Sequence, residues 1–382
     1  MPLPLRLVSL LVATCVGALV PVSPAAADNH SLQRGLDELV AAPDGPPGVI
    51  VVLRDGDRQR VLRAGTADLT TGRPLEAHDH TRTASTSKAF SGAVALSLVR
   101  QHRLGLDDTI GTRLPQLPRA WRAVTLRQLL QHTSGLPDFS QSPQFRSLIA
   151  ADPRRHFDSR RLLDFVAGDP LRFAPGTQYQ YSNSDNIAVA LMAEAATGAR
   201  YEDLLRHEVY RPLGLRDTSL PQGYEMPDPY MHGYALGGPT GPEDVSEAIG
   251  MSGVWASGGI TSTPRDLAAF ISGYAAGALT SQAALREQRH WIPGASEPAG
   301  PGSNSAGLAL FRYDTRCGVV LGHTGNTLGY TQLMAATPDG RRALTFSLTT
   351  QVNQAGSPDL LRKLRAVEEE AVCSLLGGTY GS

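Results

Sequence analysis

Ser85 and Lys88 stand three residues apart in the run Ser85-Thr86-Ser87-Lys88, at the start of a predicted helix. Positions i and i+3 share one helical face, so the Lys88 amine can reach the Ser85 hydroxyl and accept its proton. The free N–H groups at the start of a helix can also stabilise an oxyanion that forms during acyl transfer. The spacing therefore predicts a serine nucleophile at Ser85, with Lys88 as its base.

Lysine is rare in this chain. Of 35 lysine and arginine residues only Lys88 and Lys363 are lysines, so 35 − 2 = 33 are arginines. A catalytic amine must lose its proton, which a guanidinium with a pKa above about 12 cannot do. The presence of lysine at position 88 therefore supports its role as the base.

A second motif is Tyr181-Ser182-Asn183, which follows a Pro-Gly turn at residues 175–176. A phenol beside a serine nucleophile can relay a proton, although a tyrosine considered in isolation is more typical of a protein core. The adjacent Ser-Asp-Asn run at residues 184–186 is another form of the same element. Tyr181 is preferred because the turn precedes it.

A third motif is His323-Thr324-Gly325, which follows the strand-like residues 318–321. An edge strand here could pair with an extended substrate backbone, and the glycine would allow close approach. A Gly-rich strand end would look the same in isolation. The three motifs in this order and spacing are a stronger indication of an acyl-transfer site than any one of them.

The elements around these motifs come from both ends of the chain. Residues 48–53 and 59–64 are expected to form a hairpin, residues 31–41 and 85–101 helices, and residues from 104 to about 239 a mainly helical section. From about residue 249 turns and short strands are expected, followed by a closing helix; the strands are at 318–321, 330–336 and 343–349, and the helix at 358–376. This order predicts an α/β (α+β) fold, in which one antiparallel sheet receives strands from both chain ends and helices are inserted between them.

The motif order resembles that of the serine β-lactamase and D-Ala-D-Ala carboxypeptidase superfamily, class C β-lactamases in particular. The resemblance covers nearly all of residues 28–378 and includes the stretches at 124–138, 173–183 and 255–267. It implies a β-lactamase/transpeptidase-like fold with a sheet lobe at about 28–100 and 245–378 and a helical lobe at about 101–244. The placement of the cysteine pair is also similar to that in exported actinomycete carboxypeptidases.

The same resemblance assigns roles to individual residues. Ser85 would form the acyl-enzyme, Lys88 and Tyr181 would share proton transfer, and Asn183 would hold the substrate amide. In the third motif, His323-Thr324-Gly325, Thr324 would touch a substrate carboxylate. The N–H groups of Ser85 and Asn326 would form the oxyanion hole, and Trp255 would line the cleft wall.

One departure concerns the substrate. Carboxypeptidase relatives carry an arginine on the strand before His-Thr-Gly to hold the terminal carboxylate, and Phe311 stands at that position here. Arg312 beside it faces the opposite side of a strand. Asn326 likewise stands where a hydroxyl residue is expected. These differences favour an esterase, an amidase or a D-aminoacyl peptidase over recognition of a free C-terminal carboxylate.

The first choice is nevertheless a D-alanyl-D-alanine carboxypeptidase or transpeptidase-like peptidase, acting on peptidoglycan-type peptides. Its alternatives with the same site are an esterase, a D-aminoacyl amidase or peptidase, and a β-lactamase. A hypothesis of another class is a non-catalytic penicillin-binding sensor, against which the three intact motifs argue.

Residues 1–27 have the layout of a secretory signal, with Arg6, an apolar run too short for a membrane span, and Ala25-Ala26-Ala27. We therefore expect a secreted protein cleaved near Ala27. The two remaining cysteines, Cys317 and Cys373, then form a disulfide by default in an oxidising compartment; two buried free thiols are the alternative.

Several classes of function are excluded by composition and motif. The net charge is −1 with no block of like charges, so no nucleic-acid partner is expected. His78-Asp79-His80 has no further ligands at metal-binding spacing, and no Gly-x-Ser-x-Gly elbow of an α/β-hydrolase occurs. The expectation is a monomer with a small-molecule or peptidoglycan-peptide substrate, no metal and no cofactor.

Overall fold

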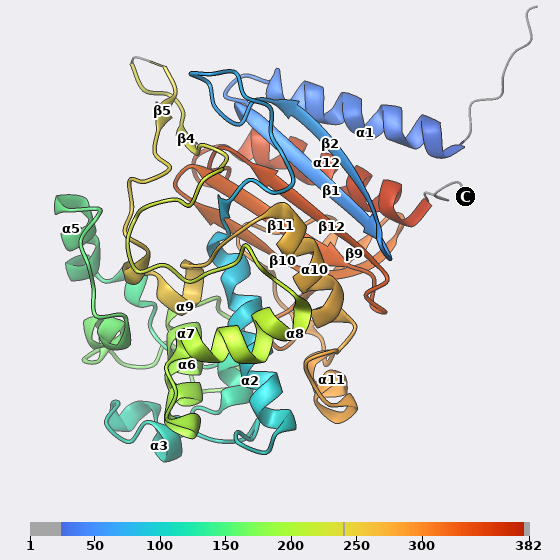
Figure 1. Ribbon diagram of the computed structural model, residues 1–382. Helices are drawn as coiled ribbons and strands as arrows, with labels where there is room; N and C mark the ends of the chain where they lie inside the picture. Colours follow the sequence, from blue (N-terminus) through green and yellow to red (C-terminus); the bar gives the residue numbers. More distant parts are fainter. Residues whose placement is uncertain (1–23, 240, 378–382) are drawn as a thin grey trace, which may run out of the picture.

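An eight-stranded antiparallel sheet forms the centre of the protein in the computed structural model, which describes residues 24–239 and 241–377 (Figure 1). Its strand order is β2-β1-β12-β11-β10-β9-β8-β7. The strands are β1 (Gly48–Asp55), β2 (Arg58–Gly65), β7 (Ile292–Pro293), β8 (Ser303–Ala306), β9 (Phe311–Thr315), β10 (Gly318–Thr327), β11 (Tyr330–Ala336) and β12 (Arg342–Leu348). The hairpin β1–β2 joins the C-terminal strands through β12, so the sheet does combine the two ends of the chain.

Both faces of this sheet are covered by helices. Helices α1 (Pro24–Val40) and α12 (Pro358–Gly377) contact each other and one face, whereas α10 (Pro264–Ala275) packs against β1, β10, β11 and β12 (Figure 1). All seven residues of β11 are buried, as expected for a strand with apolar layers on both sides. The rigidity of this sheet fixes the edge of β10, which forms part of the site described below.

Helix α2 (Ser87–Arg100) lies between the sheet and the helical part of the chain. Residues 87–98 are all buried, and the small side chains of Ala89, Gly92 and Ala93 let neighbouring elements approach. The 3-10 turn η1 (Ala84–Thr86) before it contacts β10 and β11, while α2 itself contacts α6 (Asn183–Thr197) and α9 (Trp255–Gly258). One central helix therefore carries the first motif to the junction of both parts.

The remaining elements are short. They are β3 (Thr81–Arg82), α3 (Ile110–Arg113), η2 (Arg119–Trp121), α4 (Leu126–Leu130), η3 (Phe139–Gln141), α5 (Pro143–Ala151), η4 (Ser159–Val166), α7 (Tyr201–Leu204), the π-helix η5 (Leu205–Tyr210), α8 (Arg211–Leu213), β4 (Tyr234–Ala235), β5 (Glu243–Asp244), η6 (Met251–Gly253), β6 (Thr261–Ser262) and α11 (Gln282–Gln288).

The predicted fold class is confirmed, and one expected region is wrong. Turns and short strands were expected from about residue 249, but residues 264–275 form α10. Its start signals are present in the sequence, since Thr263 accepts a hydrogen bond from the Asp266 N–H and Pro264 occupies the first helical turn. The lobe boundaries near residues 100 and 245 stay a prediction, because α2 packs against both parts.

Cys317 and Cys373 form a disulfide that joins the start of β10 to α12, with Cα atoms 5.1 Å apart.

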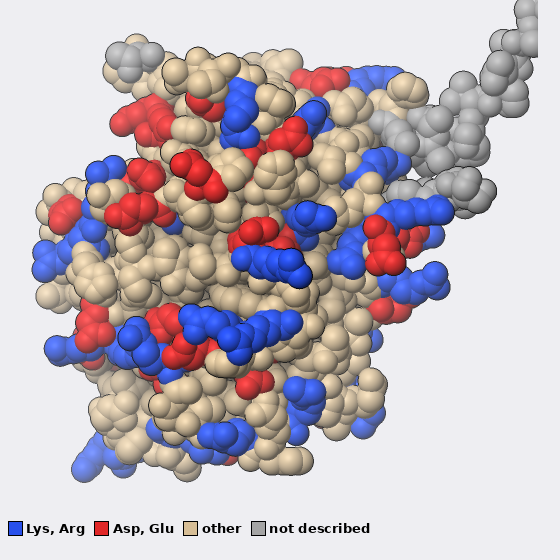
Figure 2. Space-filling view, in the orientation of Figure 1, with Lys and Arg blue, Asp and Glu red and all other residues tan. Residues whose placement is uncertain are grey.

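The expected signal at residues 1–27 falls mostly on residues 1–23, outside the described part of the chain. Within residues 24–239 and 241–377, no helix combines the length and apolarity needed to cross a bilayer. On the face drawn in Figure 2, acidic and basic side chains are intermixed.

Candidate active site

Ser85 lies in the 3-10 turn η1, at the point where the chain enters α2. Ala84 has a positive φ of 49°, a left-handed conformation that turns the backbone sharply just before the half-buried serine. The β10 backbone approaches this turn closely: a Cβ atom on Gly325 would lie 2.4 Å from the Thr83 carbonyl oxygen and 3.1 Å from the Ser85 nitrogen. Only glycine at position 325 allows this contact, which brings the first and third motifs together.

Lys88 is fully buried, and its ammonium has three acceptors. Nζ donates to Ser85 Oγ at 3.0 Å, to Asn183 Oδ1 at 2.8 Å and to the Ser257 carbonyl at 2.7 Å. Burial lowers the pKa of Lys88 to about 7, and the nearby acidic groups oppose this shift only in part. A substantial fraction of Lys88 is therefore neutral near pH 7, as a general base requires.

Tyr181 completes the proton-transfer group. The Lys88 Nζ atom lies 4.9 Å from the centroid of its ring. Burial raises the pKa of the phenol well above its usual value, with the Ser85 hydroxyl acting in the opposite direction. The Tyr181 hydroxyl is buried without a fully formed hydrogen bond, so it stays protonated and free to donate to a group that arrives beside Ser85.

Asn183 is the first residue of α6, and its side chain is fully used within the protein. Its Oδ1 accepts from Lys88, while Nδ2 donates to Asp138 Oδ2 and to Ser140 Oγ, both at 3.0 Å. Asp138 also accepts from the Asn183 backbone N–H at 3.0 Å. Asp138 was not selected from the sequence as a functional residue, although it ends the stretch 124–138. A substrate amide can bind the Asn183 side chain only by replacing one of these partners.

The β10 edge faces the cleft beyond Gly322. Strand β9 pairs with β10 only as far as Gly322, and no strand in the described chain pairs with residues 323–327 on that side. Asn326 and Thr327 line the cleft there. The Asn326 side chain donates to the Val352 carbonyl and so ties the strand to the loop after β12, while its backbone N–H is the expected oxyanion donor.

His323 and Thr324 are both buried in β10. Burial and the Lys88 charge lower the pKa of His323 to about 3, so the imidazole is neutral; Nδ1 lies 2.6 Å from the Thr324 carbonyl and Nε2 has no partner. The Thr324 hydroxyl donates to the Pro298 carbonyl at 2.5 Å. Contact between Thr324 and a substrate carboxylate would therefore require this bond to break.

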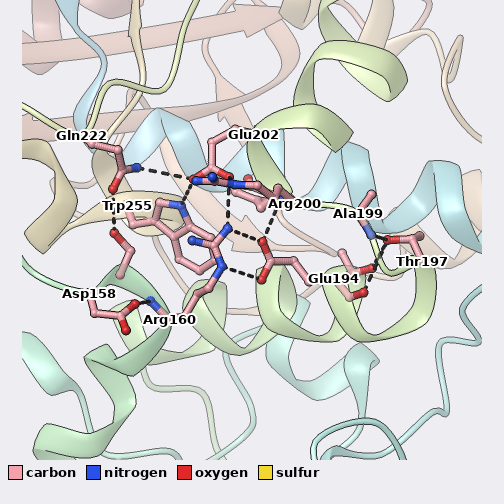
Figure 3. Close-up of polar contacts among 12 residues, drawn as sticks. Asp158, Arg160, Glu194, Thr197, Ala199, Arg200, Glu202, Gln222 and Trp255 are labelled. Carbon is pink, nitrogen blue, oxygen red and sulfur yellow. Dashed lines mark hydrogen bonds and ion pairs between the residues drawn. The ribbon is translucent and has the colours of Figure 1, made fainter.

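Trp255 does not line the cleft, which corrects the expectation from the sequence. Its side chain is fully buried, and the indole Nε1 donates to Glu202 Oε1 at 3.1 Å (Figure 3). The Arg160 guanidinium lies over the ring and pairs with Glu194 and Glu202. The segment was identified correctly, because Val254 and Ser257 on either side do line the cleft, but the indole packs into the core against these partners.

The alternative Ser-Asp-Asn run is also buried. Asp185 accepts a hydrogen bond from the Ser134 hydroxyl at 2.5 Å and lies 2.8 Å from His132 Nδ1, and the His132 ring packs against the Tyr181 ring with centroids 4.5 Å apart. Burial lowers the pKa of His132 to about 3, and burial raises the pKa of Asp185 well above its usual value. This cluster supports the segment that carries Tyr181 and does not reach the cleft.

The cleft around Ser85 has a volume of about 1160 Å³. Residues that were not selected from the sequence form much of its wall, among them the exposed Glu297. Others come from the loop after β12 and from α12: Gln351, Asn353, Gln354, Ala355, Arg362 and Arg365. In the described chain no group of three or more His, Cys, Asp or Glu residues has the arrangement of a metal site. Asp79 of the His-Asp-His run pairs with Arg73.

Comparison of the sequence with known proteins identifies a matching family and several similar enzymes. The profile of the family described as Beta-lactamase matches residues 36–368. The D-aminopeptidase of Cereibacter sphaeroides is 29% identical over 310 residues, which are 79% of this chain and 56% of that protein. The chain thus spans about half the length of the curated relatives it matches.

Solved structures that are similar to this chain include those of an amidase and an amidohydrolase. The D-amino acid amidase from Ochrobactrum anthropi SV3, in complex with D-phenylalanine, has a TM-score of 0.78 at 26% identity and covers 92% of this chain and 98% of its own. A D-stereospecific amidohydrolase from Streptomyces sp. has a TM-score of 0.76 at 26% identity, over 89% of this chain and 98% of its own.

Proposed function

Because the chain belongs to the Beta-lactamase family, and is therefore a serine hydrolase, we propose that it cleaves D-aminoacyl amides and short peptides that begin with a D-residue. This replaces the carboxypeptidase hypothesis as first choice. The similarity of this chain to a D-aminopeptidase and to a D-amino acid amidase supports the proposal. The activity would proceed through an acyl-enzyme on Ser85.

The observation that carries this proposal is the side chain at position 311. Phe311 is buried in β9, and its ring packs against the His323 imidazole with centroids 5.0 Å apart. Arg312 lies on the other side of the strand and pairs with Asp314 at 2.6 Å. No guanidinium on β9 is therefore directed to the site to bind a terminal carboxylate, which a carboxypeptidase must recognise.

In the proposed reaction neutral Lys88 accepts the Ser85 proton while Ser85 Oγ attacks the substrate carbonyl carbon. The N–H groups of Ser85 and Asn326 would bind the oxyanion of the tetrahedral intermediate. When the C–N bond breaks, the leaving nitrogen takes a proton from Tyr181, which recovers one from Lys88. Water then attacks the acyl-enzyme by the reverse proton path and releases the D-amino acid.

A substrate panel tests the proposal. We expect kcat/KM for D-phenylalaninamide to exceed that for L-phenylalaninamide, and that for an N-acylated peptide ending in D-Ala-D-Ala, by at least about tenfold. Faster release of the terminal D-alanine would restore the carboxypeptidase hypothesis. Faster cleavage of a nitrophenyl ester or a chromogenic cephalosporin alone would favour an esterase or a β-lactamase.

Labelling of the nucleophile is the accompanying control. A fluorophosphonate should label Ser85, and Ser85→Ala should abolish both labelling and turnover. Ser134 is buried and donates to Asp185, so it should stay unlabelled. Labelling of Ser85 without turnover of any substrate would instead support the penicillin-binding sensor.

A further inference from the structure

The segment from Ala295 to Pro298 forms one wall of the cleft and is held firmly in place. The Tyr179 hydroxyl donates to the Ala295 carbonyl at 2.6 Å, and the Ser296 hydroxyl lies 3.0 Å from the Tyr313 hydroxyl. The Thr324 hydroxyl donates to the Pro298 carbonyl. Both sides of Glu297 are thus fixed to the strands of the site and to the chain that carries Tyr181.

Glu297 itself has no partner of its own. Its side chain is exposed in the cleft with Ser85 and Tyr181, and it forms no hydrogen bond or ion pair with the described residues. Although the side chain is exposed to the cleft, the surrounding wall partly desolvates the carboxyl and so raises the pKa of Glu297, and the Lys88 charge opposes that shift. An unpaired carboxylate on a fixed segment is available to interact with a substrate.

The hydrogen bonds of this wall place it near the residues that would act on the leaving group. The leaving nitrogen must receive its proton from Tyr181, whose ring contacts the His323 ring with centroids 6.4 Å apart. The Ala295–Pro298 segment is bonded to Tyr179 and Thr324, the neighbours of these two residues. The Asn183 and Asp138 side chains that hold Lys88 form a separate part of the site.

The arginines of the cleft wall are held by other groups of the protein, as Arg146 is by the Ser140 carbonyl and Gln141. Phe311 is uncharged, and His323 is neutral because its pKa is lowered by burial to about 3. Arg365 lines the cleft, but its guanidinium donates to the carbonyls of Gly300 and Gly302. Arg362, also in the cleft wall, pairs with Asp359.

We propose that Glu297 makes the leaving-group subsite selective by charge, so that it excludes carboxylates and accepts neutral amides or cationic groups. This rests on the proposed function and deepens it, because it explains how an amidase would reject peptides whose leaving residue carries a free carboxylate. Specificity of this kind arises from an unfavourable interaction with the wrong substrate as well as from contacts to the right one. Two like charges in a partly desolvated cleft repel far more strongly than they do in water.

The test uses leaving groups that differ only in charge. The substrates are 3-acetoxybenzamide and 3-acetoxybenzoate, whose acetyl group needs only the Ser85 chemistry. We expect the wild-type enzyme to hydrolyse the amide with a kcat/KM about tenfold higher than the carboxylate, and Glu297→Gln to bring this ratio to about one. Glu297→Asp should keep the preference, and the exposed β5 residue Glu243, changed to Gln, is the matched control.

Ionic strength gives a second readout that a structural defect would not imitate. The wild-type ratio should fall as salt rises from about 0.05 M to about 1 M, because screening weakens the repulsion, while the Glu297→Gln ratio should not change. A Glu297→Gln ratio equal to that of the wild type, or a wild-type preference for the carboxylate, would overturn the proposal.

The two proposals can fail separately. If D-phenylalaninamide is not cleaved but the acetates keep their charge preference, the proposed function is wrong and the subsite stands. If D-phenylalaninamide is cleaved and Glu297→Gln leaves the ratio unchanged, the function stands and the role of Glu297 is wrong. The pair D-alanyl-D-alanine and D-alanyl-D-alaninamide repeats the comparison with peptide leaving groups.

Discussion

The Trp255 indole donates to Glu202 Oε1 at 3.1 Å, and two residues later the Ser257 carbonyl accepts a hydrogen bond from Lys88 at 2.7 Å. Trp255 has a positive φ of 36°, and the turn of α9 that it begins brings the Ser257 carbonyl beneath the ammonium. The ring is also covered by Arg160, whose guanidinium lies 5.2 Å from its centroid (Figure 3). The indole therefore anchors the turn that supplies one of the three acceptors of Lys88.

Replacement of Trp255 should reduce stability. Trp255→Ala removes a fully buried side chain, and we expect a loss of about 3–5 kcal/mol in the free energy of unfolding, measured by urea denaturation. Trp255→Phe should lose less and keep most of the activity. If Trp255→Ala is as stable as the wild type and only KM rises, the side chain lines the cleft after all, as the sequence had suggested.

The pH dependence of the reaction should report Lys88. Because burial lowers its pKa to about 7, kcat/KM for a neutral substrate should rise with pH through a midpoint near 7 as the amine loses its proton. The histidines of the site cannot produce this limb, since burial lowers the pKa of His132 and of His323 to about 3. A limb that is unchanged by substitution of these histidines would agree with this assignment, and a midpoint above about 9 would contradict it.

The pH dependence of the free energy of unfolding should also report Lys88. Between pH 7 and the unfolded value of 10.5, the unfolded chain binds more protons at Lys88 than the folded chain does, so this residue makes stability increase with pH across that interval. The comparison of urea midpoints at about pH 7 and pH 9, in wild type and Lys88→Met, isolates the contribution. An equal increase in both proteins would assign it to other groups.

The disulfide should stabilise the sheet against the final helix. The pair closes a loop with a sequence separation of 56, for which the chain-entropy treatment gives about 4 kcal/mol. The double variant Cys317→Ser, Cys373→Ser should unfold at lower urea than the oxidised wild type, and a reductant should shift only the wild type. Detection of two free thiols by mass spectrometry in protein from an oxidising compartment would refute the bond, which was expected from the secretory pattern at residues 1–27.

Sequence reasoning identified the residues that act through local spacing. Ser85 and Lys88 are fixed by one turn of helix, and strand β1 by its continuous apolar run. Asp138 could not be identified in this way, because Asn183, which it contacts, is 45 residues away along the chain. Glu297 could not be identified either, because the cleft wall to which it belongs is formed by several different elements. Trp255 was misplaced for a related reason: which side of a turn its ring occupies depends on Glu202 and Arg160, which tertiary packing brings there.

Lys88→Arg is the sharpest test of the proton transfer. The substitution keeps a positive charge and approximate reach, but a guanidinium cannot become neutral at working pH. The Lys88 amine, by contrast, is brought to a pKa of about 7 by burial and stands 3.0 Å from the Ser85 hydroxyl. Since a general base contributes about 10²–10⁴-fold, kcat/KM for an activated ester should fall by at least about two orders of magnitude while circular dichroism shows a folded protein.

A matched control for this variant is Lys363→Arg, which changes the other lysine of the chain, on α12, and should leave kcat/KM unchanged. If folded Lys88→Arg keeps more than about a tenth of the wild-type kcat/KM, Lys88 does not supply the base. The phenol would then be the next candidate, because the Tyr181 ring centroid lies 4.9 Å from Lys88 Nζ and the Ser85 hydroxyl acts on its pKa. Tyr181→Phe would decide that question, with a loss of activity comparable to that expected here for Lys88→Arg.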